Sequence, residues 1–518
     1  MSKKKSIVNV IVLVMFLNIF VKIFSFTRDF LLGRVIGVSI EMDAYLMSLS
    51  ITTKFFVAFG SALVTAIIPL IVKEESENAK REKFVDIFNF LFIMGTIISI
   101  IYMVFTPQII GMYVSGFSAE KMALTITLTR IMIPSIYAIL YAYFFVAIMQ
   151  SNSRYLLAAC ISLPYNALII FYIVTSAKAN FNVYALSLVT LVGWFGQAFL
   201  LIPSVIRMKP FKIKARSIWN DNTKLFVKGF FITSIVVATI QATNITNNKF
   251  LSYYGDGVVT TYFYGNMIYN TITTMVVYAI TVVMFPKFNE SYVKNRDEFY
   301  FYIKRVLQVI VIILLPICIG LILVGDVMMM ILFLSENYDY ESVMQTSNFL
   351  KIFALNCVSF GFIDVLNKGY YATGKRVIPL KTTAIIVGLN VVFNVIFILI
   401  YGTSGNFYLV VLSTVVSYVI GVLYSLISFD FTNKRDALKN ILTTFIKCLF
   451  AGVFMYIVVA FVQNIAFGSL VEMPVLNKFI YLFSSIIIGI ISYFSFLIIV
   501  KEKIVSESFF SMVKKLKK

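Results

Sequence analysis

The sequence contains no histidine, and only 13% of its residues are charged. Without histidine the chain cannot form a Ser-His-Asp triad, and it lacks the commonest protein ligand of transition metals. No glycine-rich P-loop is present, which argues against direct ATP hydrolysis. We therefore expect a non-enzyme with no catalytic residue and no metal site. The four cysteines stand singly in apolar stretches, as buried structural thiols do: Cys160, Cys318, Cys357 and Cys448.

Apolar residues dominate what is present. They make up 60% of the chain, and the mean hydropathy is +0.92, whereas soluble domains contain about 45–50% apolar residues. A crossing needs about 20 residues, so the sequence predicts an all-α polytopic membrane protein with about 14 transmembrane helices. The predicted spans are residues 7–26, 44–72, 84–105, 122–149, 155–175, 183–206, 225–244, 259–285, 306–324, 349–371, 378–401, 408–429, 441–462 and 479–500. Residues 327–334 could add a re-entrant or interfacial piece.

Basic residues gather in alternate loops and at both ends of the chain. The intervening loops hold little beyond Lys121, Lys178, Lys249 and Lys478. By the positive-inside rule, both termini then lie in the cytoplasm, which requires an even number of spans. The net charge of +20 is therefore interpreted as orienting the chain in a bacterial cytoplasmic membrane. We expect membrane lipids and no nucleic acid among its partners.

Two pairs of similar short segments indicate an internal repeat. Pro69 and Pro286 each end a span and lead through a charged loop to the next span at the same spacing. The sequences QSNSR at 150–154 and ATGKR at 372–376 each close the fourth span of one half. Parallel repeats around a central cavity are a known transporter plan. We expect two pseudo-symmetric six-helix lobes around such a cavity, residues 1–218 and 219–432, then a C-terminal helix pair and basic cytoplasmic tail, residues 433–518.

Charged residues concentrate in or beside the first two spans. A charge at the centre of a membrane helix costs about 2.5–3.5 kcal/mol on insertion scales, so such residues usually face a cavity. Several of them in consecutive spans predict a hydrated, charged chamber. The candidate site residues are Lys22, Arg28, Asp29, Asp43 and Lys54.

Helical spacing suggests how these charges pair. Eleven residues separate Asp43 from Lys54 and seven separate Lys22 from Asp29, so each pair should share a face of an α-helix. Each acid could hold a cation in the empty chamber and release it to an arriving phosphate. The alternative interpretation is static interhelical pairs, or side chains that snorkel at span ends.

Polar residues of later spans admit the same two interpretations. They could line the chamber or pair with one another. They are Arg130, Lys351, Asp364 and Lys368, with Asn266 and Asn270 of the eighth span.

The motifs FTRDFLLGRVIG at 26–37, MDAYL at 42–46 and KFFVAFGSALVTAIIP at 54–69 resemble the opening signature of the MviN/MurJ flippases. These belong to the multidrug/oligosaccharidyl-lipid/polysaccharide exporter superfamily. The resemblance implies transport of lipid II, an undecaprenyl-diphosphate-linked peptidoglycan precursor, from the inner to the outer leaflet. It also implies that Lys22, Arg28 and Lys54 are the cations of the cavity and Asp43 its acid. Lysine replaces the family's usual arginine at 22 and 54, and Asn266 stands where the family has an arginine.

Three classes of function remain open. The first is the lipid II flippase, or a flippase of another lipid-linked oligosaccharide, working by alternating access as a monomer. It needs no cofactor, although a coupling cation or the membrane potential could drive it. The second is a cation-coupled multidrug exporter, which the excess of positive charge in the first two spans disfavours. The third is a membrane enzyme such as a polysaccharide polymerase, which the short loops disfavour.

Overall fold

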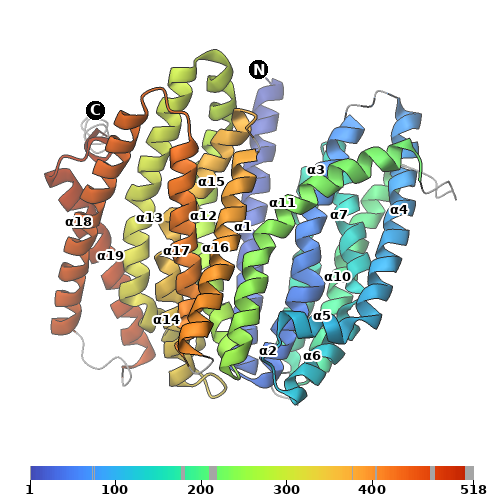
Figure 1. Cartoon of the computed structure of the whole chain (residues 1–518), viewed down its shortest axis with the longest axis horizontal. Coiled ribbons are helices and arrows are strands. Elements are labelled where there is room, and N and C mark those ends of the chain that lie inside the picture. Colours follow the sequence, from blue (N-terminus) through green and yellow to red (C-terminus); the bar gives the residue numbers. More distant parts are fainter. Residues whose placement is uncertain are drawn as a thin grey trace. The chain divides into compact units, whose positions relative to one another are not determined.

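The computed structural model describes residues 2–72, 74, 76–176, 181–208, 219–375, 377–402, 405–466 and 473–507 (Figure 1). All long elements of this part of the chain are helices, and its β pairing is limited to one isolated bridge between Ser335 and Tyr338. The basic loop at 209–216 and the basic end of the tail, residues 508–518, lie outside the described residues. The chain divides into two compact units, Met1–Thr260 (unit 1) and Thr261–Lys518 (unit 2).

Unit 1 is built around α3, which packs against α7 and α11, and around α10, which packs against α7 and α9. Its elements are α1 (Ser2–Ile36), α2 (Ile40–Leu49), η1 (Ser50–Lys54), α3 (Phe55–Val72), α4 (Glu77–Val104), α5 (Thr106–Tyr113), α6 (Ala119–Met132), α7 (Ser135–Ser151), α8 (Tyr155–Ala159), α9 (Leu163–Ser176), α10 (Val183–Arg207), α11 (Asp221–Leu251) and η2 (Ser252–Tyr254).

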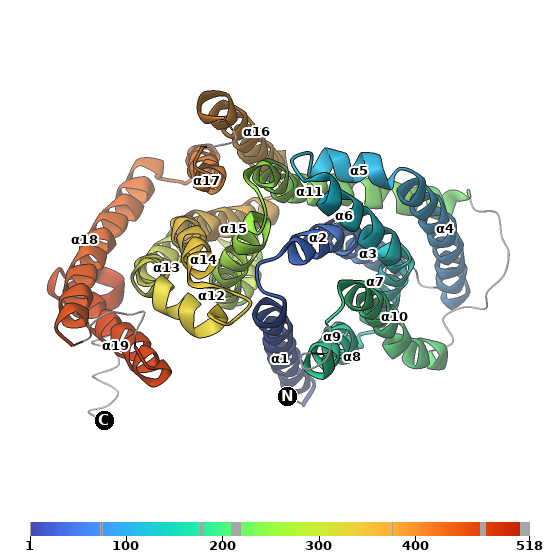
Figure 2. The same ribbon diagram turned by 90° about the horizontal axis from the view of Figure 1, so that it is seen from below.

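Unit 2 is organised around α13, which packs against α14, α15, α18 and α19 (Figure 2). Its helices are α12 (Val258–Lys294), whose first turn still belongs to unit 1, α13 (Arg296–Phe333), α14 (Tyr340–Ala354), α15 (Cys357–Ala372), α16 (Val377–Tyr401), α17 (Tyr408–Ser428), α18 (Lys434–Ala466) and α19 (Val475–Ile499). Because α13 continues to Phe333, residues 327–334 are not the separate re-entrant or interfacial piece that the sequence allowed.

The helices confirm an all-α membrane protein. Ten described helices are long and apolar enough to cross a bilayer, and the bent pairs α6–α7 and α14–α15 raise this number to twelve. The helices α1 and α11 are not among these twelve; they are 35 and 31 residues long and cover the predicted spans 7–26 and 225–244. With these two, the twelve become fourteen, and each of the fourteen corresponds to one predicted span.

The fourth span of each half is broken in the same way. The helices α6 and α7 meet at 43°, and α14 and α15 meet at 44°. At the end of α7, Ser153 has φ 59° and the N–H of Arg154 donates to the carbonyl of Met149 at 2.8 Å. At the end of α15, Gly374 has φ 76° and the N–H of Lys375 donates to Tyr370 at 3.0 Å. Both ends are therefore helix caps of the Schellman type.

This shared cap corrects the predicted register of the repeat. Aligning QSNSR with ATGKR pairs residues 372 − 150 = 222 positions apart. The two positive-φ residues are instead 374 − 153 = 221 positions apart. Arg376, the last residue of ATGKR, lies outside the described residues. The lobe boundaries at 218 and 432 stay predictions; α11, which comes after the first of them, packs against α3, α4 and α5.

Candidate substrate site

Arg28 lies in the last third of α1 and is held by two partners. Its Nε and Nη2 donate to Oδ1 of Asp29 at 2.9 and 2.7 Å, and its Nη1 donates to Oδ1 of Asn166 at 2.8 Å. Asn166, on α9, is fully buried, and its Nδ2 donates in turn to Oγ of Ser25 at 2.9 Å. The side chains of Arg28 and Asp29 are only 13% and 14% exposed. Charge-assisted hydrogen bonds thus hold a guanidinium in one orientation within an apolar helix.

Aromatic side chains pack beside this guanidinium. Its central carbon lies 4.9 Å from the ring centroid of Tyr165 on α9, within the range of cation–π attraction. Tyr165 packs against Trp194 of α10, with ring centroids 4.9 Å apart. The two helices approach closely at Gly193, where a Cβ atom would lie 3.1 Å from Cα of Tyr165. Arg28 is therefore both hydrogen-bonded and stacked.

Lys54 joins the same group of charges from the end of η1. Its side chain is exposed, and it lies within electrostatic range of Asp29, which attracts its charge, and of Arg28, which repels it. Unit 1 thus brings together three of the predicted site residues, with two cations and one carboxylate. We call this set, together with Tyr165 and Asn166, the Arg28 cluster.

The structure does not place Asp43 and Lys54 on one helix face. The prediction assumed an unbroken α-helix, but residues Ser50–Lys54 form a π-helix. A π-helical turn holds about one extra residue, which rotates the next part of the helix by about 100° relative to α-helical spacing. Asp43 is accordingly fully buried, whereas Lys54 is exposed.

Asp43, near the start of α2, is enclosed by protein donors. Its Oδ2 accepts from Nζ of Lys121 at 2.5 Å and from the N–H of Gly257 at 2.7 Å. Its Oδ1 accepts from the N–H and the hydroxyl of Thr260 at 2.8 and 2.5 Å. Asp43 therefore caps the first turn of α12 within unit 1, because N–H groups there have no intrahelical acceptor.

Lys121 is the residue that sequence reasoning missed. Its side chain is 1% exposed, and besides Asp43 it contacts Asp256 at 3.1 Å and lies 4.1 Å from the ring centroid of Phe117. From the sequence it counted only as a rare lysine of an outer loop. No local signal marks it, since its partner Asp43 is 78 positions away.

The other two predicted site residues are Lys22 on α1 and Asn266 on α12. Lys22, with an exposed side chain, precedes Arg28 on α1 by six residues, about 9 Å along the axis and about 120° around it. Asn266, on the α12 segment of unit 2, is half-buried and accepts from Nδ2 of Asn270 at 2.6 Å.

The charges of the tenth span form ion pairs in unit 2. Lys351 pairs with Asp326 of α13, and Lys368 pairs with Asp364 one turn earlier on α15, each at 2.6 Å. Lys368 also donates to Oγ1 of Thr281 at 2.5 Å. The sequence had left open whether these charges pair or line the chamber, and in this structure they pair.

A protein-family model described as lipid II flippase MurJ matches residues 32–476. The chain belongs to the MurJ family. It is therefore a multi-pass membrane transporter that functions in cell-wall biosynthesis, and it is not an enzyme. The lipid II flippase MurJ of Thermosipho africanus is 24% identical over 431 residues, which are 82% of this chain and 86% of that protein. A probable lipid II flippase MurJ of Buchnera aphidicola (subsp. Schizaphis graminum) is 22% identical, with 74% and 76% covered.

Solved structures support the same fold. A lipid II flippase MurJ in an inward closed conformation matches with a TM-score of 0.81 at 22% identity, covering 95% of this chain and 100% of that chain. A multidrug resistance transporter of the MATE family, from the MOP superfamily, matches at 0.63 and 14% identity, covering 84% and 99%. The MurJ family thus shares its helical architecture with drug exporters.

The chemistry available in unit 1 is that of anion binding. A guanidinium offers a planar fork of donors, and an ammonium offers a compact point charge. Within the described residues no group of three His, Cys, Asp or Glu side chains could hold a metal ion. The Arg28 cluster can therefore neutralise and orient a phosphate without covalent chemistry.

Proposed function

We propose that this member of the MurJ family carries lipid II, a lipid-linked sugar diphosphate, from the inner to the outer leaflet of the cytoplasmic membrane. The observation that carries the proposal is the Arg28 cluster, two cations against one carboxylate, set in membrane helices of unit 1. A diphosphate cannot cross hydrocarbon bare, because uncompensated transfer of its charges out of water costs many kcal/mol. The cluster supplies the compensating charge.

Asp29 stabilises the charged Arg28 side chain while the site is empty. While no cargo is present, its Oδ1 accepts two hydrogen bonds from Arg28, which keeps the cation paired. An arriving diphosphate offers more charge and more acceptor oxygens, so the Arg28 fork turns from Asp29 to the phosphate while Asn166 and Tyr165 keep its position. Lys54, exposed on η1, adds a second countercharge.

The orientation and the driving force belong to the same proposal. The distribution of lysine and arginine supports both termini in the cytoplasm, so cargo enters from the inner leaflet. Two lobes that rock around a central cavity then expose the site to each side in turn. Moving one elementary charge through the membrane potential is worth about 2.3 kcal/mol per 100 mV, which suffices to bias such a cycle with or without a coupling cation.

A second candidate is the flipping of another lipid-linked oligosaccharide. It is favoured by Asn266, a neutral residue at the position where the family resemblance implies an arginine, and by lysine at 22 and 54. Export of cationic drugs, which the fold alone would permit, is disfavoured because the Arg28 cluster has a positive excess.

Complementation separates these candidates. The chain is expressed in a strain depleted of its own lipid II flippase, beside Arg28→Ala and, as a control, Arg34→Ala, an exposed arginine on the same helix. We expect growth with the native chain and with Arg34→Ala, but not with Arg28→Ala at equal membrane abundance. Failure of the native chain to rescue, with surface-polysaccharide export restored in a matching depletion strain, would assign the second candidate.

A further inference from the structure

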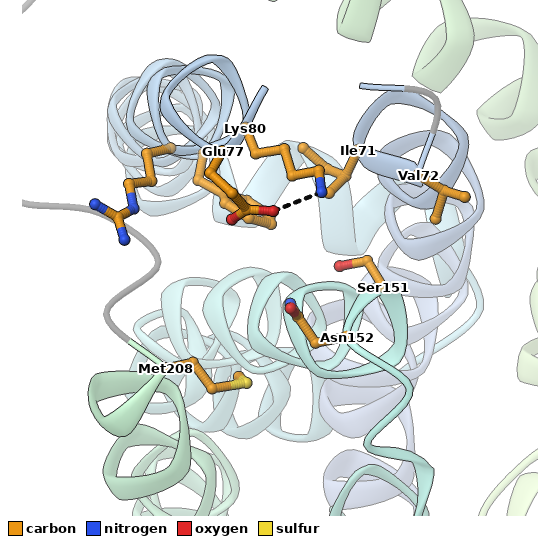
Figure 3. A pocket seen from close by; sticks show the side chains of 9 residues that line it. Ile71, Val72, Glu77, Lys80, Ser151, Asn152 and Met208 are labelled. Atoms are coloured by element: carbon orange, nitrogen blue, oxygen red, sulfur yellow. Dashed lines mark hydrogen bonds and ion pairs between the residues drawn. The ribbon is translucent and has the colours of Figure 1, made fainter. Parts of the chain in front are cut away.

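Unit 1 contains a cavity that is separate from the Arg28 cluster. It has a volume of about 180 Å³ and lies where the ends of α3, α7 and α10 meet the start of α4. Figure 3 shows Glu77 and Lys80 of α4 on one side of it, with Ser151 at the end of α7 and the following Asn152 on the other. The remaining lining is formed by Ile71, Val72, Arg81, Phe84 and Met208.

The cavity lies where the charged start of a membrane helix changes to its apolar part. The first turns of α4, through Lys83, are rich in charge, and the apolar part of the helix begins at Phe84. Val72, the last residue of α3, also lines the cavity and is 62% exposed. In a membrane helix, such a change from charged to exposed apolar residues is typical of the boundary between headgroups and hydrocarbon.

Its polar groups match a phosphodiester that carries hydroxyl groups. Lys80 and Arg81 are two adjacent cations, and Lys80 is already oriented by Glu77 at 2.7 Å. Across the cavity, Nδ2 of Asn152 donates to the carbonyl of Ile148 at 2.8 Å, which fixes the plane of its amide. The cations suit a phosphate, and the Glu77 carboxylate and the Asn152 amide oxygen can accept hydrogen bonds from a polyol.

We propose that this cavity binds the phosphoglycerol headgroup of an anionic phospholipid. A lipid source fits better than a soluble one, because the exposed Val72 provides an apolar surface for an acyl chain beside the cations. A choline headgroup fits poorly, since a quaternary ammonium is held by several aromatic faces, and among the described lining residues Phe84 alone is aromatic. Basic pockets between membrane helices are known to take anionic headgroups. The proposal does not depend on which cargo the protein carries.

The test is lipid retention by the purified full-length protein. Detergent-purified protein is incubated with dioleoyl phosphatidylglycerol or dioleoyl phosphatidylcholine, and bound lipid is counted by native mass spectrometry. We expect a phosphatidylglycerol adduct that weakens about fivefold for each cation removed, in Lys80→Ala and in Arg81→Ala. Lys294→Ala, which removes an exposed lysine paired with Glu290 at 2.6 Å, is the matched control and should leave the adduct unchanged.

A variant that keeps every charge distinguishes the cavity from general surface attraction. Met208→Trp fills the cavity and should also abolish the adduct, while the unfolding temperature shows that the protein remains folded. An adduct that survives Met208→Trp would overturn the proposal, as would equal retention of phosphatidylcholine. Displacement of the lipid by millimolar glycerol 3-phosphate would assign the cavity to a soluble phosphate and would also overturn it.

Discussion

The ammonium group of Lys121 lies 2.5 Å from the carboxylate of Asp43, and the two side chains are 1% and 0% exposed. Asp43 also accepts from the backbone of Gly257 and Thr260, the residues at which the chain leaves unit 1. A buried pair of this kind is costly to assemble but far more costly to break, because removal of one partner leaves an uncompensated charge. The pair therefore determines whether the start of α12 is held on unit 1.

Breaking this pair should destabilise the fold. We expect Lys121→Met and Asp43→Asn each to lower the free energy of unfolding by about 3–5 kcal/mol, with reduced membrane abundance. The double variant Asp43→Asn with Lys121→Met should lose less than the sum of its two single variants, because it leaves no unpaired buried charge. Heat unfolding of the purified proteins measures this difference. Lys294→Ala, at an exposed pair, is the control and should change stability by less than about 1 kcal/mol. Full additivity would show that the two residues do not interact.

Arg28 should not be replaceable by lysine. Lysine keeps the charge but loses the fork that reaches Asp29 and Asn166 together, and it loses the stacking on Tyr165. We expect Arg28→Lys to lower translocation of lipid II in proteoliposomes about tenfold or more, with little change in unfolding temperature. Arg34→Lys, on the same helix, is the matched control. Equal activity of Arg28→Lys and the native protein would remove the fork from the mechanism.

Lys54 should matter for transport and not for stability. Its side chain is exposed, so Lys54→Gln removes a countercharge without leaving a cavity, and Asp29 keeps its ion pair with Arg28. We expect translocation to fall at least tenfold while the unfolding temperature stays unchanged, and we expect Lys54→Arg to retain activity, because arginine offers the same charge with more donors. A loss of folded protein in Lys54→Gln would instead indicate a structural role.

The membrane fold could be predicted from the sequence because few other structures bury apolar runs of this length. The prediction extends to α1 and α11, whose apolar runs are interrupted by polar side chains. Helix α1 carries Lys22, Arg28 and Asp29, and α11 carries a run of amides including Asn247 and Asn248. Both helices nevertheless fall on predicted spans.

The parts of the site that escaped prediction depend on contacts distant in sequence. That Arg28 and Asp29 pair could be inferred from a short motif, but their connection to Asn166 spans 138 positions. The π-helix at Ser50–Lys54 leaves no pattern in the residue types, and it separates Asp43 from Lys54. Lys121 looked like a solvated loop lysine because the carboxylate that holds it in the interior comes from another helix.

Two glycines allow a matched test of the backbone around Asp43. Gly257 donates its N–H to Asp43 and has φ +81°, and a Cβ there would lie 2.2 Å from Cγ1 of Val38. Both features oppose a side chain, since only glycine adopts such a φ without strain. We expect Gly257→Ala to lower the unfolding free energy by about 1–3 kcal/mol.

Gly111, in helix α5, is the control. A Cβ added there would have no heavy atom within 4 Å, so Gly111→Ala should be neutral or stabilising by up to about 1 kcal/mol. Heat unfolding of the two purified variants measures their stabilities. Equal stability of Gly257→Ala and Gly111→Ala would show that the turn at Gly257 is not held against Asp43.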